Sequence, residues 1–267
     1  MPGAARKSAV QSYWRLRAVL PACLHRGMPW DFWLIFLFLG VVLPWRGSER
    51  MRKLMALPEV TGRERIQLYA STILFQWALT GLVAWRAFAR GMSLPELGVM
   101  NPCSPSIVVL AAGGAAFIAV AHWMNVRRMA GTNHPTAEKL RAMAVRLFPR
   151  SPVQTLFFVT LALTAGICEE FIFRGFAMAA LFHLGLSKLA VILLSSALFG
   201  AAHLYQGKGG SVGTGIVGAL FAVVRIAYHS LLPGMIWHTV LDIVAGVAGA
   251  RYFGVAPNKN AVLHNRP

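Results

Sequence analysis

The chain has 267 residues, of which 57% are hydrophobic and only 13% are charged. A water-soluble domain of this length needs more polar surface, so the composition indicates an integral membrane protein. The net charge is +17, and the 26 lysines and arginines lie mostly in clusters between apolar runs. This distribution favours contact with the anionic headgroups of a lipid bilayer, and it argues against a nucleic-acid partner.

Apolar runs long enough to cross a membrane begin only at Trp30, after a polar and basic stretch that is not typical of a cleaved signal peptide. The candidate spans are 30–45, 67–85, 106–124, 155–183, 188–204, 212–230 and 233–250. They are too long and too continuous to be the alternating strands of a membrane barrel. We therefore predict an all-α, polytopic transmembrane helix bundle of about seven to eight spans.

The domain organisation follows from these runs. We predict a basic N-terminal segment at 1–29, a transmembrane helical domain at 30–250 and a polar C-terminal tail at 251–267. Between the third and fourth spans, residues 125–150 form an amphipathic pattern, which indicates either a helix along the membrane surface or an ordinary loop helix. We expect a multi-pass protein of the inner (plasma) membrane of the cell.

Cysteine does not suggest a disulfide framework or a metal centre. Cys23, Cys103 and Cys168 are odd in number and lack metal-ligand spacing. Catalysis by Cys168 is disfavoured, because the two acids that follow it oppose formation of a thiolate.

Three of the acidic side chains, Glu169, Glu170 and Asp242, lie well inside apolar runs. An ionisable group at membrane depth costs about 2.5–3.5 kcal/mol to insert, so its presence is a functional-site hypothesis by default. The alternative is a polar clamp between helices.

Helix geometry separates the two adjacent glutamates. Glu170 and Arg174 are four residues apart, so they share a helix face and can form an ion pair. Glu169 points about 100° away and lacks that partner. We expect the Glu170–Arg174 pair to anchor the helix and Glu169 to be free to act as a general base.

Two histidines occur in later spans. His203 lies four residues after Phe199, and His238 lies four residues before Asp242, so each pair shares a helix face. The Asp242 carboxylate can then orient the His238 ring through a hydrogen bond. Straight helices would leave the two histidines at different depths, and convergence requires helix tilt, a shortened helix or a dip of the glycine-rich segment 206–215.

At these residues the chain resembles the CAAX protease and bacteriocin-processing (CPBP, or Abi) family of glutamic-type intramembrane peptidases, which is related to type II CAAX prenyl endopeptidase. The family pattern EExxxR, FxxxH and HxxxN or HxxxD occurs in order as EEFIFR (169–174), FGAAH (199–203) and HTVLD (238–242). The resemblance covers about residues 150–250. It implies a hydrolase, without a cofactor or a metal, that cleaves a membrane-associated, prenylated or precursor peptide.

The resemblance also implies a role for each residue. Glu169 and His203 would activate the attacking water, and His238 with residue 242 would support the oxyanion. Glu170 and Arg174 would hold the helix. Where the family often has asparagine this chain has Asp242, which can donate a hydrogen bond only when protonated and otherwise acts by orienting His238.

Two other functions remain open on the sequence. Glutamate, two histidines and aspartate form an acceptable zinc set, although HExxH is absent and no two histidines are four residues apart. A non-catalytic membrane scaffold or a proton-coupled transporter also buries Glu, His and Arg, although the chain shows no repeated half.

Overall fold

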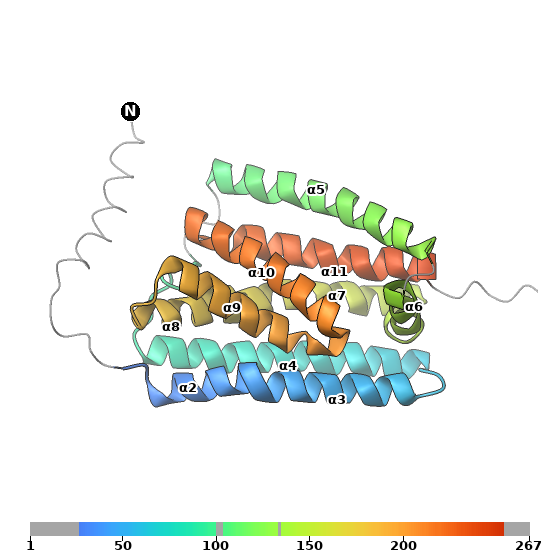
Figure 1. Cartoon of the computed structure of the whole chain (residues 1–267), viewed down its shortest axis with the longest axis horizontal. Coiled ribbons are helices and arrows are strands. Elements are labelled where there is room, and N and C mark those ends of the chain that lie inside the picture. The colour runs from blue at the N-terminus through green and yellow to red at the C-terminus, as the bar shows by residue number, and fades with distance from the viewer. Residues whose placement is uncertain (1–26, 100–103, 133–134, 254–267) are drawn as a thin grey trace, which may run out of the picture.

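The computed structural model describes residues 27–99, 104–132 and 135–253, and the regular structure within these ranges is entirely helical. Most of the predicted N-terminal segment and C-terminal tail lie outside the described residues. Most of the long helices run along the longest axis of the molecule, whereas α9 and α10 are inclined to them (Figure 1). Their bounds are α2 Trp30–Leu37, the π-helical η1 Phe38–Val42, α3 Leu43–Ala56, α4 Gly62–Ala89, α5 Pro105–Ala130, α6 Pro135–Leu147, α7 Pro152–Glu170, the π-helical η2 Phe171–Ala177, α8 Met178–His183, α9 Lys188–Ala202, the 3₁₀-helical η3 Leu204–Gln206, α10 Lys208–Tyr228 and α11 Leu232–Phe253.

Within the described ranges, six helices are long and apolar enough to cross a membrane. They are Trp30–Ala56, Gly62–Ala89, Pro105–Ala130, Pro152–His183, Lys208–Tyr228 and Leu232–Phe253. The remaining predicted span is the shorter apolar helix α9. The prediction of an all-α polytopic bundle is confirmed, and the protein is an integral membrane protein.

The helix starts are specified locally by side-chain caps. Thr61, Ser104, Ser151 and Ser187 each accept a hydrogen bond from the backbone N–H three residues further on, at the first turns of α4, α5, α7 and α9. These caps satisfy backbone donors that have no partner within the helix. Glycine-rich residues 208–215 belong to α10, so a dipping loop at segment 206–215 is not the alternative that occurs.

The continuous helix formed by α7, η2 and α8 is the central element of the bundle. Every residue from Ile172 to Leu181 is buried; α4, α9 and α10 pack around this stretch, and α11 packs on the preceding α7. Edge-to-face contacts such as Phe32 on Phe176, with ring centroids 4.8 Å apart, fill the surrounding core. Charged residues in this helix therefore lie in the protein interior.

Helix α6 crosses the ends of the long helices and is seen nearly end-on in Figure 1. Its buried Ala137 and Ala144 pack with Val126 of α5 and with Ala248 and Phe253 of α11. The amphipathic segment predicted at 125–150 is thus the end of α5 followed by a separate helix with one buried face.

A buried arginine on α4 holds the C-terminal end of α6. Arg65 is 1% exposed and donates to the carbonyl oxygens of Val145 at 3.1 Å and Arg146 at 3.0 Å, and to Gln154 Oε1 at 3.1 Å. The neighbouring Tyr69 hydroxyl donates to the carbonyl of Leu147. A cation at a helix C-terminus satisfies carbonyls without intrahelical partners and compensates the helix dipole.

We expect Arg65→Met to lower the free energy of unfolding by about 2–3 kcal/mol, because buried carbonyls lose a charged donor. Thermal unfolding of the detergent-purified protein measures this loss. The exposed neighbour Arg63 provides the control, and Arg63→Met should change stability by no more than about 0.5 kcal/mol. Similar melting temperatures for the two variants would contradict the role given to Arg65.

Candidate functional site

The two adjacent glutamates end helix α7, and the π-helical turn η2 follows directly. Glu170 and Arg174 are 1% and 0% exposed, and the distance from Arg174 Nη1 to Glu170 Oε1 is 2.8 Å. The i,i+4 ion pair expected from the spacing is therefore present, and it lies in the fully buried part of the central helix. Glu169 points elsewhere and keeps 18% of its side chain exposed.

Aromatic rings complete the surroundings of the Arg174 guanidinium. Its Cζ atom lies 3.9 Å from the ring centroid of Phe199 and 5.7 Å from that of Phe221. Among the described residues, the Nε and Nη2 atoms have no hydrogen-bond acceptor, and the cation is stabilised there by ring electrons. A Cβ atom at Gly218 would lie 2.5 Å from Arg174 Nη2, so this approach of α10 requires glycine.

His238 is oriented by Glu170. The distance from His238 Nδ1 to Glu170 Oε1 is 3.1 Å, and because a carboxylate oxygen accepts, Nδ1 is the donor. The expected partner, Asp242, has its Oδ2 atom 3.7 Å from the other ring nitrogen, Nε2, which is beyond hydrogen-bond distance. Glu170 thus occupies the orienting position that the spacing of His238 and Asp242 suggested for the aspartate.

His203 follows the last residue of α9. Its Nδ1 lies 2.8 Å from the carbonyl oxygen of Phe199 and must donate to it. When the ring is neutral, Nε2 therefore carries the lone pair, and this nitrogen faces the Glu169 carboxylate. The ring also lies against Phe199, with centroids 4.6 Å apart, so Phe199 contacts both Arg174 and His203.

The two histidines converge although α9 and α11 begin at the same end of the bundle, where Glu96 contacts both His183 and Arg225. With 15 residues, α9 is only about 22 Å long at 1.5 Å per residue, and it ends inside the bilayer thickness of about 30 Å. His238 lies in the second turn of α11. Helix α9 is also inclined to α11 (Figure 1), so a short helix and a helix tilt both occur.

The Glu169 carboxylate is at the centre of the polar cluster. Its Oε2 atom lies 3.6 Å from His203 Nε2 and 3.9 Å from His238 Nε2. Asp242 is the most exposed member, at 40%, so the cluster is reachable from the Asp242 side. Within the described ranges, no group of three His, Cys, Asp or Glu side chains has a geometry that could hold a metal ion.

One contact of Glu169 comes from a residue that sequence reasoning missed. Gln76 in the middle of α4 donates from Nε2 to Glu169 Oε1 at 2.7 Å. This interaction fixes one carboxylate oxygen and leaves Oε2 toward the histidines. The sequence feature that could have identified Gln76 is its place as a lone glutamine within the apolar run STILFQWALT. A polar side chain at membrane depth needs a hydrogen-bond partner.

The comparison with known families agrees with the motifs. Residues 151–244 match a family model described as Rce1-like, "Type II CAAX prenyl endopeptidase Rce1-like". The match confirms the resemblance that the three motifs indicate, and it supports an intramembrane CAAX-type endopeptidase in general. No curated protein and no solved structure matches the chain.

Replacing Glu170 should destabilise the protein, because Glu170→Ala leaves the fully buried Arg174 without a counter-ion. Breaking a buried ion pair in this way costs about 3–5 kcal/mol. We expect a clear fall in melting temperature in detergent, whereas Glu169→Gln should melt close to wild type because the amide can keep the contact with Gln76. Equal melting temperatures for Glu170→Ala and Glu169→Gln would refute this division.

Proposed function

We propose that the protein is a glutamic-type intramembrane endopeptidase, in which Glu169 and His203 activate water and His238 with Asp242 supports the oxyanion. The observation that carries the proposal is the convergence of Glu169 Oε2 on the Nε2 atoms of His203 and His238, at 3.6 and 3.9 Å. These separations are too long for direct hydrogen bonds. They suit polar groups that act on one shared water molecule or substrate oxygen.

The proposed reaction begins with a water molecule held by Glu169 Oε2 and His203 Nε2. Glu169 removes a proton while the water oxygen attacks the carbonyl carbon of the scissile peptide bond. The resulting tetrahedral intermediate carries a negative oxygen, which His238 Nε2–H stabilises. The proton on Glu169 passes to the leaving nitrogen as the carbon–nitrogen bond breaks, and the products are a new carboxylate and a free amine.

Donation from both nitrogens of His238 requires the imidazolium form. Glu170 accepts from Nδ1, and the Glu169 carboxylate lies 3.9 Å from Nε2, so the positive charge has counter-ions on both sides. Glu170 and Arg174 act as positioning residues, because they touch the catalytic imidazole and the Phe199 ring rather than the reacting atoms.

The substrate proposed for this site is a membrane-associated peptide bearing an isoprenoid chain. The matched family is described by its activity on prenylated CAAX sequences. An apolar cavity of about 370 Å³ lies between the first span and α4, lined by side chains that include Leu34, Phe38, Phe75 and Leu79. Phe75 directly precedes Gln76, so a hydrocarbon chain in this cavity would lie beside the residue that contacts Glu169. The inner (plasma) membrane is the proposed location.

Loss of the proposed base should abolish hydrolysis without unfolding the protein. We expect Glu169→Gln and His203→Ala to reduce kcat/KM for a prenylated peptide by at least about 10²-fold. Cleavage in detergent, followed by mass spectrometry, measures the effect, and Glu138→Gln on the exposed face of α6 is the control. Near-wild-type turnover by Glu169→Gln would eliminate the glutamic mechanism, and inactivation by a chelator would favour the zinc alternative.

Asp242→Asn tests whether the carboxylate charge at this position is needed. Because Glu170 already orients His238, we expect the asparagine variant to retain activity within about tenfold of wild type, since its amide can donate to the oxyanion. The Asp242→Ala variant should lose more activity than Asp242→Asn. The check is a pH–rate profile of each variant, and a selective loss of Asp242→Asn activity at high pH would instead assign Asp242 to stabilising the His238 cation.

A further inference from the structure

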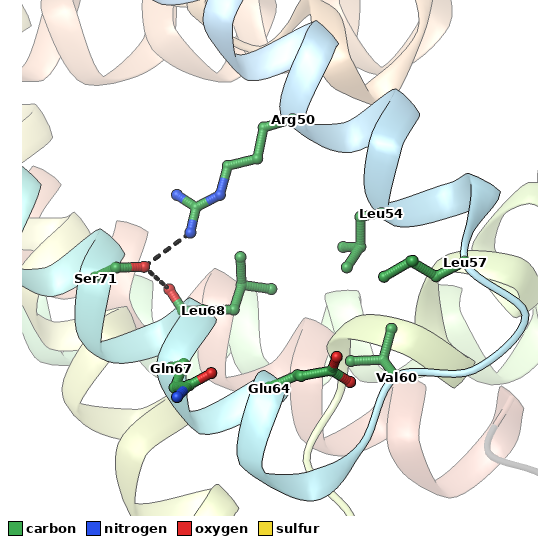
Figure 2. Close-up of a pocket in the computed structure, with 8 residues that line it drawn as sticks. All are labelled: Arg50, Leu54, Leu57, Val60, Glu64, Gln67, Leu68 and Ser71. Carbon is green, nitrogen blue, oxygen red and sulfur yellow. Dashed lines mark hydrogen bonds between the residues drawn. The ribbon is translucent and has the colours of Figure 1, made fainter.

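A second cavity, of about 310 Å³, lies between α3 and α4 near the turn that joins them (Figure 2). The two helices pack on different partners, α3 on η3 and α9 and α4 on α7, which leaves this cleft between them. Leu54, Leu57, Val60 and Leu68 supply its apolar lining. The polar side chains are Arg50 and Ser71 at one end, and Glu64 and Gln67 at the other (Figure 2).

Arg50 reaches across the cleft from α3 to α4. Its Nη2 donates to Ser71 Oγ at 2.8 Å, and its Nη1 donates to Thr72 Oγ1 at 3.4 Å. Both acceptors are neutral hydroxyl groups. The guanidinium is therefore held in position by hydrogen bonds that leave its charge available.

The nearby carboxylates are engaged elsewhere. Glu49 pairs with Arg52 at 2.7 Å and with Lys53 at 3.5 Å, and Glu64 accepts from the backbone and hydroxyl of its own helix cap, Thr61. Among the described residues, no carboxylate forms an ion pair with Arg50. An anion entering the cleft would meet an oriented cation with unused charge.

Contacts along both α4 and α3 connect Arg50 with the proposed catalytic cluster. On α4, Thr72 and Gln76 are four residues apart on one face, about 6 Å along the axis, and Gln76 contacts Glu169. On α3, Gly47 lies one turn from Arg50 and against Tyr205, where a Cβ atom would be 3.6 Å from the ring. The Tyr205 ring is in turn 5.6 Å from that of His203. The Arg50 guanidinium therefore contacts α4 about one helical turn from Gln76, the residue that holds Glu169.

We propose that Arg50 binds the free C-terminal carboxylate of the peptide substrate, an inference that rests on the endopeptidase function proposed above. An extended peptide advances about 3.3 Å per residue, so two or three residues after the scissile bond span about 7–10 Å and reach the cleft. The planar guanidinium presents parallel donors that match a carboxylate. Arg50 would then make the enzyme cut at a fixed short distance from a chain end.

The test compares two prenylated peptides that differ only at the C-terminus, one a free acid and the other an amide. We expect wild type to show a KM about tenfold lower for the acid, since one charge-assisted contact is at stake. Arg50→Gln should abolish this preference by raising KM for the acid to the value for the amide. Arg52→Gln, which removes a charge two residues away in the exposed pair with Glu49, should keep the preference.

Binding measurements separate this inference from the proposed function. In Glu169→Gln protein of wild-type melting temperature, we expect tighter binding of the acid than of the amide, and the added Arg50→Gln change should equalise them. If wild type cleaves neither peptide, the proposed function fails, whereas an Arg50-dependent acid preference in binding still supports the carboxylate site. Equal affinities for acid and amide overturn the inference.

A lipid phosphate is the competing anion, and the same protein in nanodiscs distinguishes it. Bilayers of phosphatidylcholine with and without phosphatidylglycerol should give the same acid preference if Arg50 binds the peptide. An Arg50-dependent response to phosphatidylglycerol, together with equal binding of acid and amide, would overturn the carboxylate assignment in favour of a headgroup site.

Discussion

The buried carboxylate of Glu170 is the interaction on which the rest of the site depends. A charge in a low-dielectric interior is tolerated only when it is paired and hydrogen-bonded. Oxygen Oε1 of Glu170 accepts hydrogen bonds from Arg174 Nη1 at 2.8 Å and from His238 Nδ1 at 3.1 Å. Arg174 in turn lies on the rings of Phe199 and Phe221. One carboxylate thereby links α7 and η2 to α11 directly, and to α9 and α10 through the arginine.

This network makes stability inseparable from the geometry of the proposed site at Glu170. The same hydrogen bond that satisfies the buried carboxylate also fixes which nitrogen of His238 faces Glu169, the proposed base. Phe199 has a comparable double role, since its ring covers the Arg174 cation and its carbonyl orients His203. Glu169 differs because its side chain keeps 18% of its surface exposed and, among the described residues, its buried Oε2 has no hydrogen-bond partner. The buried glutamate and the glutamate proposed as the base can be adjacent in sequence because a helix turns about 100° per residue.

Sequence periodicity predicts contacts within one helix better than contacts between helices. The ion pair of Glu170 and Arg174 follows directly from i,i+4 spacing, and the apolar runs predict the helical bundle. By contrast, the alignment of His203 with His238 depends on where α9 ends, and no local rule determines that end. The second neighbour of His238 depends on packing too: Asp242 is near in sequence and lies 3.7 Å from Nε2, whereas Glu170, 3.1 Å from Nδ1, is near only after α7 and α11 have packed. Gln76 and Arg65 make contacts 93 and 89 residues away, which no spacing pattern reveals.

The motif residues and the cavity walls come from different parts of the chain. The three motifs lie within residues 151–244, the range that matches the family. Gln76, which donates to Glu169 Oε1, lies outside this range on α4. The linings of both cavities also lie outside it, on α2, η1, α3 and α4 and on the turn between α3 and α4. In the proposed mechanism, the residues that hold water and an oxyanion are constrained by the reaction, whereas walls that face a substrate are constrained by its shape and charge. On that proposal, the N-terminal helices are where selectivity for a substrate can change without altering the proposed catalytic groups.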